Sequence, residues 1–96
     1  MKEKNAYVYI LASQRNGTLY VWVTSDLIKR MYEHQNWIFE GFTKKYNCKI
    51  LVHFEILWNM YDAISREKFL KWKKRGFKID LIEKENKLWK NLGEVL

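Results

Sequence analysis

A single carboxylate stands out in residues 60–72, where apolar residues follow a helical spacing. Glu67 belongs to the same i, i+3, i+4, i+7 pattern as Met60, Ala63, Ile64 and Leu70. An unpaired carboxylate on a buried helix face would be strongly destabilising, so Glu67 needs a partner. A lysine at the edge of the stripe, a set of hydrogen-bond donors or a divalent cation would each supply one.

Two basic side chains occupy the corresponding face of an earlier segment. Leu27, Arg30, Met31 and His34 share one helical face, so Arg30 and His34 lie beside apolar neighbours. A structural ion pair between Arg30 and Glu67 would explain both inward-facing charges. The chemical alternative is that the planar guanidinium of Arg30 holds a phosphate while Glu67 holds a metal ion.

Aromatic residues alternate along two β-prone segments near the N-terminus. Tyr7 and Tyr9 share one face of the first segment, and Tyr20 and Trp22 share one face of the second, because strand side chains alternate with period two. Aromatic pairing across neighbouring strands explains this pattern without any chemistry. On spacing alone, that is the interpretation we favour.

A basic segment with interleaved aromatic residues surrounds and follows Glu67. Its cations include Lys68, Lys71, Lys73, Lys74 and Arg75, and its aromatic residues are Phe69, Trp72 and Phe77. Such a surface suits a nucleic-acid backbone, because each neutralised phosphate releases counterions. The net charge of +7 also favours a polyanionic partner. A solvated helix exterior is the alternative, and both interpretations stay open.

Two strands and a helix must position the N-terminal residues. Residues 7–12 and 19–24 are β-branched and aromatic, and the Asn16-Gly17 pair between them predicts a hairpin turn. Ser25 or Asp26 can cap a helix from Leu27 to about Gln35.

The second half of the sequence predicts one strand and further helices. Residues 36–47 suggest a loop that contains one helical turn. Residues 49–57 suggest a strand whose apolar run predicts a central position in the sheet, covered on both faces. Helices are expected from a cap at Asn59 or Asp62 to Trp72 and from Arg75 to Glu85, with a last turn in residues 88–96. The fold class is therefore α+β: a single domain, residues 1–96, with a small, mainly antiparallel three-stranded sheet flanked by helices.

Composition bounds the class of protein. Apolar residues make up 48% of the 96-residue chain, enough for one compact core, and the single cysteine, Cys48, excludes an internal disulfide. No stretch has the length and apolar character of a signal peptide or a membrane span. We expect a cytoplasmic protein without membrane association, and we predict no obligatory protein partner.

The elements and their inward-facing residues resemble the GIY-YIG nuclease family, in particular its small stand-alone bacterial branch. Val8-Tyr9-Ile10 and Tyr20-Val21-Trp22 stand where the family has its two signature tripeptides, and Arg30 and Glu67 follow at matching positions. Residues 19–34, 40–46, 63–68 and 81–86 are also similar. The resemblance thus covers nearly the whole chain in separated blocks that keep their order.

This resemblance implies an endonuclease that hydrolyses DNA with one divalent metal ion, Mg²⁺ or Mn²⁺. Glu67 matches the metal-binding carboxylate, Arg30 the arginine that engages the scissile phosphate, and Tyr9 and Tyr20 the two signature tyrosines. His34 matches a histidine of this branch that can take or relay a proton. A lysine that helps polarise the second tyrosine in some relatives is Val23 here, which favours His34 as the base.

Trp22 replaces the glycine that ends the second signature, and its indole would share a strand face with Tyr20 and could fill the catalytic cleft. It is an ordinary variant whose indole swings aside, a natural loss of activity, or an engineered change. The expected substrate is DNA, branched or single-stranded. The alternatives are a catalytically inactive nucleic-acid-binding domain and a protein-interaction domain that uses its exposed aromatic residues.

Overall fold

The computed structural model describes residues 5–36 and 45–96. Its elements are β1 (Ala6–Ala12), β2 (Leu19–Thr24), α1 (Leu27–Gln35), β3 (Ile50–Leu57), α3 (Met60–Trp72), α4 (Arg75–Glu85) and the 3₁₀ helix η1 (Leu92–Val95). The predicted α+β class is confirmed, and most of the loop expected between residues 36 and 47 lies outside the described residues. Within the described ranges, no helix is long and apolar enough to cross a membrane.

The three strands form one antiparallel sheet in the order β2-β1-β3. The predicted central position of β3 is therefore wrong, because β1 is the central strand and β3 is an edge. Leu51 and Val52 of β3 are nevertheless fully buried. An apolar run predicts that both faces of a strand are buried, but it does not predict the order of the strands in the sheet.

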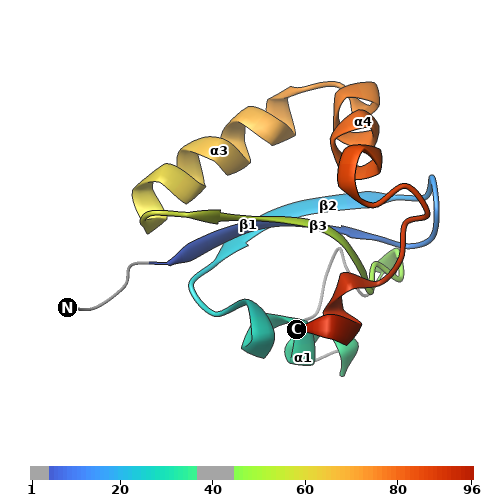
Figure 1. Ribbon diagram of the computed structural model, residues 1–96, viewed down its shortest axis with the longest axis horizontal. Coiled ribbons are helices and arrows are strands. Elements are labelled where there is room, and N and C mark those ends of the chain that lie inside the picture. Colours follow the sequence, from blue (N-terminus) through green and yellow to red (C-terminus); the bar gives the residue numbers. More distant parts are fainter. Residues whose placement is uncertain (1–4, 37–44) are drawn as a thin grey trace.

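Helices cover both faces of the sheet (Figure 1). On one face lie α3 and α4, and the core between them and the sheet includes Val8, Ile10 and Leu70. On the other face lie α1 and η1, over a core that includes Leu11 and Met31. Adjacent residues of β1 thus enter different cores, as the period of a strand requires.

The local signals in the sequence form the expected turn and caps. Asn16 adopts a φ of 59° in the β1–β2 turn, a left-handed conformation that asparagine tolerates. The Asp26 side chain accepts a hydrogen bond from the Lys29 amide and caps α1. Asn59, one of the two residues considered, caps α3 through the amide of Asp62. These short-range interactions fix where α1 and α3 begin.

A charged cluster holds α3 against the edge strand β3. Arg66 Nε and Nη2 donate to the two carboxylate oxygens of Glu55 at 2.8 and 3.0 Å, and His53 Nε2 lies 2.9 Å from Oε2. These contacts lower the pKa of Glu55 to about 2, although burial of the carboxyl opposes the shift. Because Arg66 precedes Glu67, the same cluster fixes the rotation of α3 that turns Glu67 inward.

Candidate active site

Residues from β1, β2 and α1 meet on the sheet face that α1 covers. The ring of His34 makes edge contacts with the rings of Tyr9 and Tyr20, each at 5.9 Å between centroids. The Tyr9 hydroxyl and His34 Nε2 are hydrogen-bonded at 3.2 Å. Tyr9 and His34 are almost completely buried. The predicted inward position of His34 is confirmed, and it brings the imidazole to both tyrosines.

Burial sets the protonation states of these three groups. Removal from water raises the pKa of Tyr9 above its ordinary value, and it raises that of Tyr20 in the same way. Burial, and secondarily the positive charge of Arg30, lower the pKa of His34 to about 4. At neutral pH both phenols therefore carry their protons and the imidazole is neutral. An uncharged imidazole can accept a proton.

Arg30 lies where it acts on all three of these groups. Burial raises the pKa values of Tyr9 and Tyr20 and the charge of Arg30 opposes that rise, whereas for His34 both effects lower the pKa. The Nε atom of Arg30 lies 3.4 Å from Glu33 Oε1. Glu33 in turn raises the pKa of Tyr9, so it belongs to the same charged group. A guanidinium is planar and carries five N–H donors, a form that suits the oxygens of an anionic ligand.

Glu67 approaches the site from α3, past the edge strand β2. Its carboxylate raises the pKa of Tyr20, which indicates proximity, and the residue is only 7% exposed. Its Oε2 atom forms an ion pair with Lys71 Nζ. Among the described residues Glu67 pairs with Lys71 and Arg30 pairs with Glu33, so the ion pair considered between Arg30 and Glu67 does not form. The partner of Glu67 is instead a lysine at the edge of the apolar helical stripe, which the sequence had also suggested.

Comparisons with known proteins show which family the chain is similar to. The family model of the GIY-YIG catalytic domain matches residues 5–80. The chain belongs to the GIY-YIG family. It is 35% identical over 80 residues to UPF0213 protein CPE1444 of Clostridium perfringens, covering 83% of this chain and 85% of that protein. The solution structure of UPF0213 protein BH0048 from Bacillus halodurans is similar, with a TM-score of 0.56, 25% identity and coverage of 91% and 92%.

Nucleases of the GIY-YIG family generally use a divalent metal ion. The described residues contain no group of three or more acidic, histidine or cysteine side chains that could hold one. A single carboxylate is nevertheless suitable, because Mg²⁺ keeps several of its waters and takes one or two protein carboxylates. The Lys71 ammonium on Glu67 acts as a stand-in cation and indicates that this carboxylate accepts positive charge. Glu67 therefore fits the role of metal ligand.

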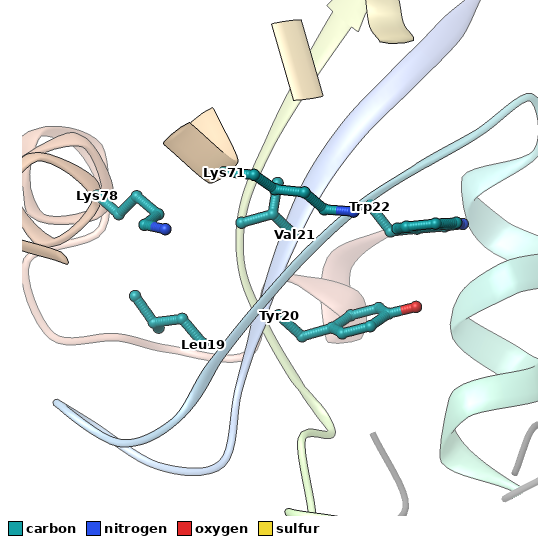
Figure 2. Close-up of a pocket in the computed structure, with 6 residues that line it drawn as sticks. All are labelled: Leu19, Tyr20, Val21, Trp22, Lys71 and Lys78. Atoms are coloured by element: carbon teal, nitrogen blue, oxygen red, sulfur yellow. The ribbon is translucent and has the colours of Figure 1, made fainter. Parts of the chain in front are cut away.

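Trp22, in the position of the signature glycine, lies beside Tyr20 as its strand position predicts. The two rings stack with centroids 6.2 Å apart, and the register places Trp22 opposite Tyr9. Trp22 is 39% exposed and lines a pocket of about 300 Å³ together with Tyr20, Lys71 and Lys78. Figure 2 shows Lys71 extending from α3 across β2 toward the indole. The indole thus forms a wall of an open pocket next to the cluster of Tyr9, Tyr20 and His34.

The five basic residues proposed to bind nucleic acid have different surroundings. Lys71 is turned toward Glu67, and Arg75 Nη2 donates to the carbonyl oxygens of Asn16 and Gly17 at 2.7 and 2.6 Å. Lys68 and Lys74 are exposed. Lys73 lies over three aromatic rings, with Nζ 5.3 Å from the centroids of Phe69 and Trp72 and 4.8 Å from that of Phe77. Arg75 is exposed as well, so it shares the outward-facing cationic surface with Lys73 and its neighbours while its guanidinium is held by the hairpin turn.

Sequence reasoning missed the surroundings of Glu33 and Lys78. The i, i+3 spacing of Arg30 and Glu33 was a signal for an ion pair. Lys78, which lines the pocket beside Trp22, has its pKa lowered by burial and by Arg75. Lys78 lies on α4, whereas most of the pocket wall comes from β2, which is far away in the sequence. No local sequence pattern could therefore indicate its position.

Proposed function

We propose that this GIY-YIG protein is a metal-dependent endonuclease that hydrolyses phosphodiester bonds of DNA. The observation that supports it best is the convergence of Tyr9, Tyr20 and His34 on one another, with Arg30 acting on all three. A packing role alone would not call for a partly exposed guanidinium beside a buried imidazole and two phenols. Membership of the GIY-YIG family, which is a family of nucleases, supports the same class of reaction.

Arg30 and Glu67 would handle the negative charge of the substrate. The guanidinium of Arg30 would hold the non-bridging oxygens of the scissile phosphate through its planar pair of N–H donors. Glu67 would hold Mg²⁺ or Mn²⁺, which when bound supplies positive charge at the phosphate and leaving oxygens. Both residues thus stabilise charge that increases in the transition state.

Tyr9 and His34 would remove the proton from the attacking water. The raised pKa of Tyr9 makes a preformed tyrosinate unfavourable at neutral pH. The water proton would therefore pass to the Tyr9 oxygen while the Tyr9 proton passes to His34 Nε2 along the 3.2 Å hydrogen bond. Tyr9 stays neutral throughout, and a negative phosphate nearby would raise the low pKa of His34 toward the working range. Tyr20 would orient the same water.

The outward surface of α3 and α4 would bind the DNA. Trp72, Lys73, Lys74 and Phe77 line a depression of about 420 Å³, and Trp72 is 76% exposed. Exposed rings stack on unpaired bases, and lysines beside them neutralise the backbone. This surface therefore favours single-stranded DNA or the single-stranded arms of branched DNA over an uninterrupted duplex.

A second candidate function is nucleic-acid binding without cleavage. The observation that favours it is the pair of contacts that Lys71 makes, with Glu67 and with the ring of Trp22. A glycine at position 22 would offer no ring, so this arrangement depends on the departure from the signature. In that case the surface around Lys73 would bind DNA while the phosphate cleavage chemistry was lost.

Incubation of the purified protein with single-stranded, branched and duplex DNA in Mg²⁺ or Mn²⁺ separates the two functions. The nuclease proposal expects cleavage that Glu67→Gln abolishes while salt-dependent binding persists. If neither the wild-type protein nor Trp22→Gly cleaves, and binding persists, the binding function replaces it. Absence of both cleavage and binding would instead favour a protein-interaction domain.

A further inference from the structure

The Lys71 ammonium is held from two sides. It forms the ion pair with Oε2 of Glu67, and it lies 3.8 Å from the centroid of the Trp22 ring. The opposite partner of that ring is Tyr20, which stacks on it at an angle of 23°. Tyr20, Trp22, Lys71 and Glu67 therefore form one continuous row from β2 to α3.

These contacts act on the carboxylate that the proposed nuclease needs for its metal ion. Glu67 is largely buried, with a side chain 9% exposed, whereas the Lys71 side chain is 42% exposed. A helical i, i+4 pair with so exposed a lysine is ordinarily weak. The Trp22 ring strengthens it, because the electron-rich face of an indole attracts an ammonium and restricts its position.

We propose that Lys71 is an internal competitor for the metal ion at Glu67 and that Trp22 is the residue that keeps it there. A divalent ion binds Glu67 only when the Lys71 ammonium leaves. Glu67 therefore has a lower affinity for the metal ion than it would have without the ion pair. The inference rests on the proposed role of Glu67 as metal ligand. It gives Trp22 a defined effect: the indole acts on the site through Lys71 rather than by filling the cleft.

Direct binding of Mn²⁺ tests this without any cleavage assay. Free Mn²⁺ is measured by its electron paramagnetic resonance signal as the ion is titrated into wild-type protein and into Lys71→Met, Trp22→Leu and Lys68→Met. Methionine keeps an apolar stem and removes the ammonium, and leucine keeps a strand side chain and removes the ring. Lys68→Met is the matched control, because Lys68 is an exposed lysine of α3 next to Glu67.

The expected result is that Lys71→Met binds Mn²⁺ roughly tenfold more tightly than the wild type, as loss of an ion pair and a cation–π contact would produce. Trp22→Leu should give a smaller gain, and Lys68→Met should change little. Glu67→Gln added to Lys71→Met should remove the gained site. Circular dichroism of each variant confirms that the helices are intact.

Three results would overturn all or part of the inference, and they differ in what else they affect. If Mn²⁺ binding depends on Glu67 but Lys71→Met gains no more than Lys68→Met, the competition is wrong while the metal site stands. If no variant has a Mn²⁺ site that depends on Glu67, both the competition and the proposed metal ligand are wrong. A gain in Lys71→Met with no gain in Trp22→Leu would remove the role of the indole.

Discussion

The Tyr9 hydroxyl and Nε2 of His34 lie 3.2 Å apart, joining the central strand to the helix that covers it. Tyr9 belongs to the first signature tripeptide and His34 to the last turn of α1. Neither position is unusual by itself, since a buried tyrosine commonly needs a hydrogen-bond partner. Their pairing satisfies two buried polar groups, and in the proposed mechanism the same contact is the route for the proton.

The buried imidazole of His34 makes stability fall in mild acid. Its pKa is lowered from 6.5 to about 4 in the folded protein, so the unfolded chain binds the proton first as the pH falls. The free energy of unfolding should therefore be unaffected above 6.5 and decrease from there toward 4, by at most about 3 kcal/mol. Urea unfolding at about pH 7 and about pH 5 measures this decrease.

The control for this prediction is His34→Gln, which cannot take up a proton but can still bond to Tyr9. Its stability should change less over the same pH interval than that of the wild type. Glu55 does not interfere, because its lowered pKa affects stability only as the pH falls from 4.5 toward about 2. Equal slopes for the wild type and the variant would show that His34 is not held neutral by burial.

The sequence could predict which residues turn inward, and much less about what they meet. Helical spacing was enough to place His34 and Glu67 on buried faces, because a period of 3.6 fixes the face of a short helix. The choice of Lys71 as partner for Glu67 was open, since it also depends on Trp22 from another element. Arg75, expected to bind nucleic acid, also donates to the carbonyl oxygen of Gly17 in the hairpin turn, 58 positions away, a contact set by how α4 packs.

Removing the Glu55 carboxylate charge should destabilise the fold. In Glu55→Gln, the fork of Arg66 loses its charged partner in a partly buried position, with an expected cost of about 1–3 kcal/mol. Thermal unfolding monitored by circular dichroism measures it. Asp80→Asn is the matched control, because Asp80 is exposed and the charge change is the same. A loss of stability no larger than in Asp80→Asn would contradict a role of the Glu55 cluster in holding α3.

The exposed ring of Trp72 should contribute to binding single-stranded DNA. Trp72→Ala should weaken binding of an oligothymidine by roughly tenfold, because one base–aromatic stack is worth about 1–3 kcal/mol. Trp58→Ala is the matched control, since Trp58 has a similar exposure of 72% but lies before α3, away from Lys73. Fluorescence anisotropy gives both affinities. Equal losses in the two variants would place the DNA elsewhere.

Lys73 should contribute to the same binding through charge rather than stacking. Lys73→Gln should make the slope of log affinity against log salt concentration shallower by about one, because one phosphate contact is lost and one fewer counterion is released. Trp72→Ala should leave that slope nearly unchanged. Measuring both slopes over a salt series separates the electrostatic from the stacking contribution, and an unchanged slope in Lys73→Gln would remove it from the DNA-binding surface.

Arg30 should matter for its planar fork as well as its charge. Arg30→Lys keeps a cation near Tyr9 and His34 but loses the paired donors, so we expect roughly a hundredfold slower cleavage with DNA binding nearly unchanged. Lys29→Gln, a change at the exposed neighbour on α1, should cleave at close to the wild-type rate. The measurement is single-turnover cleavage of a labelled oligonucleotide. A lysine variant as fast as the wild type would mean that Arg30 acts only as a point charge, because phosphate recognition through two parallel N–H bonds cannot survive that substitution.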